Sequence, residues 1–396
     1  MRIAVFEYKV TATSPSGSCC LRMLRDLCHE HEFTVFAVEF ENPCPERIHF
    51  VRIPVLTRPL ALLFLAYHLC APFCYWIYRL RRQVRFHLVL VVESNFGFGD
   101  LSYAHFCHRA YLKYHWRQTK IRGVRGALRW LDHWLRAFCE PWVYRRVQHI
   151  VVPSWGLKRD LESEYPFTQG KIHCIPNPVD IERMRLPAEV DREEVRRSLG
   201  LHPEEVVLAF VALGHFERKG LPALLQAFTQ LDEPRLKLVV VGGEPDLVAA
   251  YQVRGKRMGL GEQVIFIGMQ RDIRPYLWGA DGFILPSLYE TFSLVSLEAA
   301  AASLPLILTS VHGVEEFIQD GKNGVLVDPT VEGVVQGLSR FLALSPQARR
   351  IMGDQAQRDT AQYTPEHFVI AWRTFFYGWD MTVTRPAFRY QQSKEA

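Results

Sequence analysis

Residues 286–308 read PSLYETFSLVSLEAAAASLPLIL, in which a strand ends, a helix of small residues follows and another strand begins. Short apolar runs, each followed by a helical segment, repeat this pattern along the whole chain. These runs are RIAVFEY, FTVFAVEF, FHLVLVVES, LSYAHFC, HIVVPS and KIHCIPN in the first half, and EVVLAFVAL, LKLVVVGG, VIFIGM, GFILPS, LPLILTS and GVLVDP in the second. Strands that alternate with helices predict βαβ units and parallel sheets, so the fold class is α/β.

The chain has 396 residues, which is long for one hydrophobic core, and its two series of strands predict two domains. The proline-rich stretch IPNPVDIERMRLP marks the boundary near residue 180. We expect a first domain over residues 1–178, a second over 179–364, and an aromatic segment over 365–396 that packs back towards the first. In such folds ligands lie beyond the carboxyl ends of the strands, so the expected site is the cleft between the domains.

The net charge of +5 is unevenly distributed. Residues 1–178 hold 24 Lys and Arg against 14 Asp and Glu, and the rest of the chain holds 23 against 28. A basic first half suits a nucleic acid, an anionic membrane surface or a phosphorylated substrate, and the alternative is a merely basic surface. The composition, 48% hydrophobic and 22% charged, excludes a disordered chain.

All nine cysteines lie between Cys19 and Cys174, with no C-x-x-C pair and no Cys/His spacing typical of zinc. This pattern favours reduced thiols and a cytoplasmic location, and it predicts no metal site. The opening residues MRIAVFEY are expected to form a strand and lack the features of a signal peptide.

Residues 60–78, LALLFLAYHLCAPFCYWIY, are close to the shortest length that spans a membrane. His68 and Pro72 interrupt the apolar run, and an arginine cluster follows it. One alternative is a membrane span. The other is an interfacial or buried helix, beside which the arginines favour anionic lipid headgroups.

The stretch GHFERKG, residues 214–220, follows a predicted strand and leads into a helix. Gly214 and Gly220 allow tight backbone geometry, and Arg218 and Lys219 stand just before the helix. Cations beside a helix N-terminus make a good phosphate site. The alternative is a solvated turn.

Glu290 and Glu298 lie on either side of a predicted helix start at Thr291–Ser293. The free N–H groups of a helix start suit a phosphate, and carboxylates accept hydrogen bonds from hydroxyl groups. A phosphate with hydroxyl-rich sugars on both sides would account for both glutamates. A helix cap and an unrelated surface charge are the alternative.

The stretch PSLYETFSLVSLEAAAASLPLI resembles the E-x-F-G-x-x-x-x-E-A signature of family four glycosyltransferases. Further stretches resemble the same family, namely SPSGSCCLRML, VVPSWGLKRDL, IPNPVDIERM, GHFERKG, IFIGMQRDIRPYLWGADGFILPS and VHGVEEFIQDGKNGVLVDP. The resemblance implies retaining enzymes of the GT-B fold, in which two Rossmann-like domains face each other across a cleft. It also implies a C-terminal helix that crosses back to the first domain.

The resemblance assigns roles to residues of the second half. Glu298 corresponds to the glutamate that binds the ribose of a nucleotide-sugar, and Glu290 to the one beside the donor sugar. Lys219 corresponds to the diphosphate-binding lysine, with Arg218 as its partner. The remaining donor-binding positions are Gly214, Thr291, Phe292 and Ser293. Two positions depart from the family pattern, because His215 replaces an arginine and Ser293 replaces the signature glycine.

In the first half, Gly17 corresponds to a glycine of the loop that approaches the donor phosphates. His105 corresponds to a histidine beside the reacting sugar, with His108 as the alternative. Asn177 and Asp180 correspond to a hinge motif in which Pro178 replaces a glycine.

The function implied is transfer of a sugar from a UDP- or GDP-sugar to a saccharide or lipid-linked saccharide, with retention of configuration. We expect no tightly bound cofactor, no metal and no nucleic acid partner. A bacterial cell-surface or exopolysaccharide pathway fits, with the protein cytoplasmic or peripheral on the inner face of the cytoplasmic membrane. The alternatives are a nucleotide-sugar epimerase or phosphorylase on the same fold, and a degenerate, non-catalytic nucleotide-sugar-binding protein.

Overall fold

The computed structural model describes residues 1–55, 60–95, 97–119 and 123–383. Its contacts divide the chain into two compact units, residues 1–102 together with 366–396, and residues 103–365. The chain leaves the first unit after residue 102, so this division does not coincide with the predicted domain boundary at residue 178. That boundary stays a prediction.

The first unit contains a parallel sheet with the strand order β5-β3-β1-β6. Its strands are β1 (Arg2–Phe6), β3 (Glu32–Ala37), β5 (Ile48–Arg52) and β6 (Leu88–Val92), and a short parallel pair is formed by β2 (Lys9–Val10) and β4 (Glu39–Phe40). Every residue of β6 is buried, as expected for a parallel sheet covered on both faces. The helices of this unit are α1 (Pro15–Leu27), α2 (Leu60–Arg82) and α15 (Pro365–Val383).

Helix α15 belongs to the first unit from Glu366 onward. Arg373 forms a two-pronged ion pair with Glu30, at 2.6 and 2.9 Å, and the Phe376 ring lies edge-on to His31. Trp372 and Phe376 are completely buried. The aromatic C-terminal segment therefore returns to the first unit, as predicted, while residues 384–396 lie outside the described residues.

Helix α2 contains the apolar segment 60–78. One face packs inward, where the hydroxyl of Tyr67 donates to the Phe36 carbonyl at 2.6 Å. The other face exposes large apolar side chains, including Leu69 and Phe73 at 77% and 67%. Among the described residues, no helix has the length and apolarity needed to cross a membrane.

The second unit contains a six-stranded parallel sheet, with the strand order β12-β11-β10-β13-β14-β15. Its strands are β10 (Val206–Val211), β11 (Leu236–Val241), β12 (Val264–Gly268), β13 (Gly282–Leu285), β14 (Leu306–Leu308) and β15 (Gly324–Leu326). The same unit holds a parallel pair, β8 (His149–Val152) and β9 (Ile172–Cys174), and the chain passes from the first unit to the second within β7 (Leu101–Tyr103).

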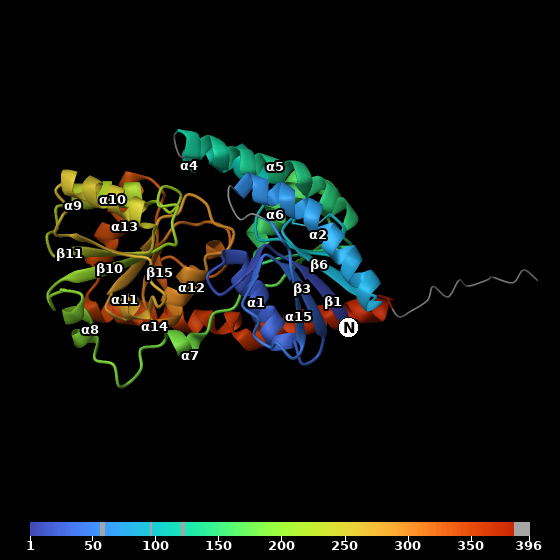
Figure 1. Cartoon of the computed structure of the whole chain (residues 1–396). Coiled ribbons are helices and arrows are strands. Elements are labelled where there is room, and N and C mark those ends of the chain that lie inside the picture. Colours follow the sequence, from blue (N-terminus) through green and yellow to red (C-terminus); the bar gives the residue numbers. More distant parts are fainter. Residues whose placement is uncertain (56–59, 96, 120–122, 384–396) are drawn as a thin grey trace, which may run out of the picture. The chain divides into compact units, whose positions relative to one another are not determined.

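Helices cover both faces of the six-stranded sheet. In Figure 1, α9 (Leu221–Leu231), α10 (Pro245–Arg257) and α13 (Val331–Leu342) lie along one face, and α8 (Arg192–Ser198), α11 (Arg274–Trp278) and α14 (Pro346–Asp359) along the other. The remaining α-helices of the unit are α3 (His108–Ala110), α4 (Trp116–Thr119), α5 (Val124–Arg146), α6 (Trp155–Glu164), α7 (Ile181–Met184) and α12 (Leu294–Ala301). A π-helix covers Tyr111–His115, and 3₁₀ turns cover Pro166–Thr168, Val314–Glu316 and Thr360–Tyr363.

The strand order reverses between β10 and β13, which are hydrogen-bonded neighbours. A reversal of this kind leaves room for a ligand beyond the carboxyl ends of the two strands. The loop after β10 contains residues 214–220, and the loop after β13 contains residues 286–293. The α/β class is confirmed, and the fold brings the two loops that the sequence singled out to the same edge of one sheet.

Candidate active site

The loops after β10 and β13 pack directly against each other. The backbone N–H of Leu288 donates to the Arg218 carbonyl at 2.8 Å. Gly220 has φ +81°, and a Cβ on it would lie 2.0 Å from the Pro286 carbonyl oxygen. Gly220 is therefore required at the start of α9, both by its backbone conformation and by this close approach.

Gly214 does not behave as predicted. A Cβ on Gly214 would meet no atom within 4 Å, and the positive φ of this turn, +56°, belongs to His215 instead. The tight backbone geometry expected at Gly214 is therefore wrong, because the chain makes its left-handed turn one residue later. A role for Gly214 in binding the donor stays a prediction.

Lys219 and Glu290 form the central ion pair of these loops. The Lys219 ammonium lies 2.5 Å from Glu290 Oε1, and their side chains are only 15% and 8% exposed. The Ser287 hydroxyl donates to the same carboxylate oxygen at 2.8 Å. Burial lowers the pKa of Lys219, the charge of Glu290 raises it, and Arg218 lowers it again. A lysine with such surroundings is typical of a functional site.

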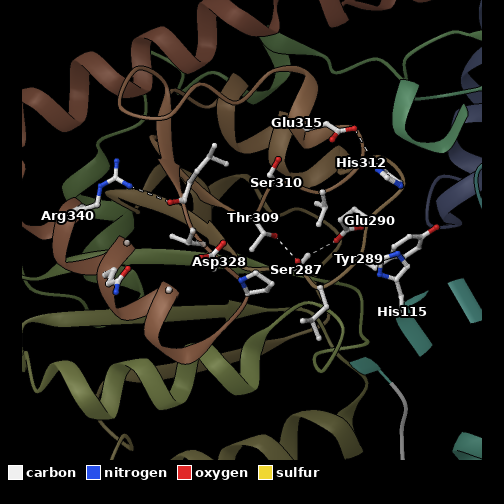
Figure 2. Close-up of a pocket in the computed structure, with 18 residues that line it drawn as sticks. His115, Ser287, Tyr289, Glu290, Thr309, Ser310, His312, Glu315, Asp328 and Arg340 are labelled. Atoms are coloured by element: carbon white, nitrogen blue, oxygen red, sulfur yellow. Dashed lines mark hydrogen bonds and ion pairs between the residues drawn. The ribbon is translucent and has the colours of Figure 1, made fainter. Parts of the chain in front are cut away.

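Glu290 also borders a cavity of about 500 Å³ at the carboxyl ends of β13, β14 and β15. Figure 2 shows the Thr309 hydroxyl donating to the Ser287 carbonyl, at 2.6 Å, beside the Ser287–Glu290 hydrogen bond. The polar residues that line the cavity are His115, Ser287, Glu290, Thr309, Ser310, His312, Glu315, Asp328, Gln336 and Arg340. These polar groups, set among apolar residues, suit a ligand rich in hydroxyl groups.

The helix after Glu290 begins where the sequence predicted. Ser293 is the N-cap residue of α12, and its hydroxyl lies 2.7 Å from the Ser296 hydroxyl. The Thr291 carbonyl accepts a hydrogen bond from the Ser154 hydroxyl at 2.6 Å. Phe292 packs against Gly313, where a Cβ would come within 2.9 Å of the Phe292 Cα. The segment is thus held by backbone and ring contacts, and its donor contacts stay a prediction.

Glu298 lies on α12 itself. Burial raises its pKa to about 7, and the charge of Arg183 opposes this rise. The lining of the 500 Å³ cavity, all of it within the described residues, includes Glu290 but not Glu298. A carboxylate that has lost part of its hydration, with only one nearby cation to offset the loss, can gain by accepting hydrogen bonds from a ligand.

The two candidate histidines have different surroundings. His105 follows β7, and burial lowers its pKa to about 4, while hydrogen bonds involving Asn177 and the Tyr103 backbone oppose this. His108 is more deeply buried, with Nδ1 2.8 Å from Nδ1 of His133 and its backbone N–H donating to Glu140 at 2.7 Å. His108 is engaged in the packed interior, whereas the role of His105 beside a sugar stays a prediction.

Gly17 belongs to the first unit and lies in the first turn of α1. A Cβ there would come within 2.0 Å of the Lys9 carbonyl oxygen, so glycine allows α1 to approach β2 closely. Its place beside a donor phosphate, like the cleft between two domains, stays a prediction.

Several site residues were not predicted from the sequence. Thr309 and Ser310 follow β14 directly, and Asp328 follows β15. Polar residues at the carboxyl ends of parallel strands are a recognisable pattern, which could have identified these three. His115 and His312 could not be found in this way, because they lie away from strand ends.

No group of three or more His, Cys, Asp or Glu side chains that could hold a metal ion occurs in the described ranges. None of the nine cysteines, all of which lie in the described residues, forms a disulfide bond. The site offers cations, carboxylates, hydroxyl groups and the N-terminus of α9.

Two family models match most of the chain. One, described as Glycosyltransferase Family 4, matches residues 17–183, and the other, described as Glycosyl transferases group 1, matches residues 205–343. D-inositol 3-phosphate glycosyltransferase of Corynebacterium urealyticum is 27% identical over 245 residues, which are 59% of this chain and 57% of that protein. The chain spans about half the length of the curated relatives it matches.

Solved structures show the same fold. Sucrose-phosphate synthase of Thermosynechococcus elongatus has a TM-score of 0.79 and 18% identity, over 96% of this chain and all of that chain. Anabaena Alr3699/HepE, in complex with UDP and glucose, has a TM-score of 0.71 and 15% identity over the same shares. With the parallel sheets described above, these likenesses confirm the predicted GT-B fold of two Rossmann-like domains. The matched models and the shared fold place this chain in the group 1, family four glycosyltransferases.

Proposed function

We propose that the protein transfers a hexose from a nucleoside diphosphate sugar to a hydroxyl acceptor with retention of configuration. The observation that carries this proposal is the buried Lys219–Glu290 pair, which lies between the start of α9 and a cavity large enough for a sugar. In the reaction the bond between the sugar carbon and the diphosphate oxygen breaks, and the acceptor oxygen bonds to that carbon. Negative charge develops on the leaving diphosphate, which takes up the proton of the acceptor hydroxyl.

Each side chain has a role in this proposal. Arg218, Lys219 and the N-terminus of α9 stabilise the departing diphosphate, because preorganised positive groups act where charge develops. Glu298 accepts hydrogen bonds from the ribose hydroxyls. Glu290 fixes Lys219 and faces the sugar, for which the cavity beside Ser287 and Thr309 provides hydroxyl contacts.

His105 is proposed to lie beside the reacting sugar. A pKa of about 4 keeps its imidazole neutral at pH 7, so that one ring nitrogen donates and the other accepts hydrogen bonds. No side chain needs to form a covalent bond to the sugar in this scheme. The chain's contribution is positioning and electrostatic stabilisation.

A product assay tests the reaction class. UDP- and GDP-hexoses are incubated with the protein and a panel of saccharide acceptors, and the products are separated by chromatography. Free nucleoside diphosphate together with an α-glycoside from an α-linked donor supports retaining transfer. An isomerised donor formed without acceptor would identify an epimerase, and no product together with intact nucleotide binding would identify a non-catalytic binding protein.

We further propose that the acceptor is a lipid-linked saccharide of a bacterial cell-surface or exopolysaccharide pathway, used at the inner face of the cytoplasmic membrane. Two helices support an anionic membrane surface. Helix α2 exposes Leu65, Leu69, Phe73, Trp76 and Leu80 along one stripe, and its last turn carries Arg79, Arg81 and Arg82. Helix α5 exposes Leu128, Leu131, Trp134, Phe138 and Trp142, and its last turn carries Arg145 and Arg146. Apolar stripes beside arginines are typical of helices that lie at a lipid interface.

Sedimentation with phosphatidylserine vesicles tests the membrane proposal. We expect the double substitution Leu69→Gln with Phe73→Gln to weaken vesicle binding by about tenfold or more, because two apolar side chains lose their burial in lipid. Ile351→Gln, which alters a comparably exposed residue of α14, is the control and is expected to bind as the wild type does. Equal binding of all three proteins, or no binding at low salt, would contradict the proposal.

A further inference from the structure

Arg129 of α5 reaches the loop that contains the proposed diphosphate site. Its guanidinium Nη1 lies 2.9 Å from Nδ1 of His215, a residue 86 positions later in the chain. Arginine can only donate, so the imidazole nitrogen is the acceptor and the His215 ring is neutral. Loss of solvent and the nearby Arg218 and Arg129 lower the pKa of His215 to about 3, which agrees with this assignment.

The same neighbourhood contains a small cavity of about 20 Å³. Arg129, His215, Glu217 and Arg218 line it, with Tyr111, Trp116, Thr119 and His133. A volume of this size accommodates about one water-sized group, such as a single phosphate oxygen, and not a sugar ring. The cavity is therefore a small pocket whose lining includes the two arginines Arg129 and Arg218.

Among the ion pairs of the described residues, none includes Arg129 or Arg218, and Nε of Arg218 is buried without a hydrogen-bond partner there. Burial and the charge of Arg218 lower the pKa of Arg129, while Glu217 raises it. Glu217 itself accepts a hydrogen bond from the Tyr251 hydroxyl at 3.2 Å.

Two cations held together at the expense of solvation need a compensating anion. The Glu290 carboxylate is already bound by Lys219 and Ser287, and Glu217, although it lines the same small cavity, forms no ion pair with either arginine in the described residues. The arrangement of Arg129, Arg218 and Lys219 around α9's N-terminus is complementary to a diphosphate, which bears charge on several oxygens.

We propose that Arg129 is a diphosphate-binding residue of the donor site, and that His215 is the positioning residue that holds its guanidinium beside Arg218. The inference rests on the proposed function. It gives a physical reason for His215 at a position where the family pattern has arginine. The positive charge comes instead from Arg129 on α5, and the His215 imidazole orients the Arg129 guanidinium.

Calorimetric titration with UDP and with GDP tests this assignment. Arg129→Met is expected to weaken binding of the nucleoside diphosphate roughly 10- to 100-fold, the usual range for loss of a hydrogen bond between charged groups. Arg145→Met is the matched control, because it removes an exposed arginine of the same helix, and its affinity is expected to equal that of the wild type.

A charge-relocation variant separates binding from folding. In Arg129→Met with His215→Arg, a guanidinium is supplied from the residue that Arg129 contacts, and we expect much of the lost affinity to return. His215→Ala is expected to weaken binding only a few-fold, by releasing the Arg129 guanidinium. Thermal unfolding of each variant reports its fold.

Unchanged affinity of Arg129→Met, or a folded double variant that stays as weak as Arg129→Met, would overturn the assignment and leave the proposed function intact. A wild-type protein that binds neither UDP nor GDP would instead overturn the proposed function itself.

Discussion

The two sides of Glu290 differ in their chemistry. One side holds Lys219, Arg218 and Arg129 beside the N-terminus of α9. The other side is the 500 Å³ cavity, whose lining includes the hydroxyl-bearing residues Ser287, Thr309 and Ser310. This difference indicates how a nucleoside diphosphate sugar would be oriented, with phosphates on the cationic side and the sugar on the hydroxyl-rich side.

The largest expected effect comes from the cationic side. Lys219→Met removes a preorganised positive group, so kcat/KM for sugar transfer should fall by roughly 10²–10³. Lys237→Met is the matched control, because Lys237 pairs with Glu205 at 3.3 Å and is as little exposed, at 15%, in the same unit. Both variants lose a partly buried ion pair, but only Lys219→Met should lose turnover. Equal turnover of the two variants would contradict the proposal that the diphosphate binds on the Lys219 side of Glu290.

Glu298 should give a pH dependence to nucleotide binding. With a pKa of about 7, its carboxyl group becomes ionised between pH 6 and pH 8, and the ionised form accepts hydrogen bonds better from the ribose. We expect the ratio of wild-type to Glu298→Gln affinity for UDP or GDP to rise by up to about tenfold over this range. Protonation of the ligand's own phosphate affects both proteins equally and therefore cancels in the ratio. A ratio that does not change with pH would show that Glu298 does not contact the nucleotide.

The same carboxyl group should reduce stability at higher pH. In the unfolded chain a glutamate ionises near pH 4.3, whereas the folded pKa of Glu298 is about 7. The unfolded state therefore loses its proton first, and the free energy of unfolding falls as the pH rises between these values, by at most about 4 kcal/mol. Urea unfolding of the wild type and Glu298→Gln measures this difference, which should grow from pH 4 to pH 7 and then stay constant. A difference that does not change with pH would show that the carboxyl group is not desolvated.

The smallest effect is expected on the hydroxyl-rich side. Thr309→Val removes the hydrogen bond to the Ser287 carbonyl, at about 1 kcal/mol, and should raise KM for the donor about fivefold with little change in kcat. Thr229→Val is the control, since it removes a comparable bond to the Leu225 carbonyl within α9. If both substitutions leave KM unchanged, the cavity is not the sugar site.

The strands and the two loops were predictable because their patterns are local. Buried runs such as the one forming β6 are short and continuously apolar, and the Gly-containing turn before α9 and the small residues of α12 follow strand ends. The sequence also identified Gly220 correctly. Gly214 shows the limit of this reasoning, because the residue that adopts the left-handed conformation depends on how the loop packs, and it is His215.

The pairings within the site could not be predicted from the sequence. Lys219 and Glu290 are 71 residues apart, and Arg129 and His215 are 86 apart. Such contacts depend on which strands are neighbours and on where α5 lies against the loop after β10, and neither follows from local periodicity. The resemblance named Lys219 and Glu290 as separate ligands, whereas the structure joins them in one ion pair.

The account depends most on the cationic side of Glu290 binding a diphosphate. Calorimetric titration of the wild type, Lys219→Met and Lys237→Met with UDP and GDP tests this directly. One of the two nucleotides should bind the wild type and Lys237→Met alike and should bind Lys219→Met at least about tenfold more weakly. Equal affinity of all three proteins for the nucleotide, or binding of neither nucleotide to the wild type, would contradict it.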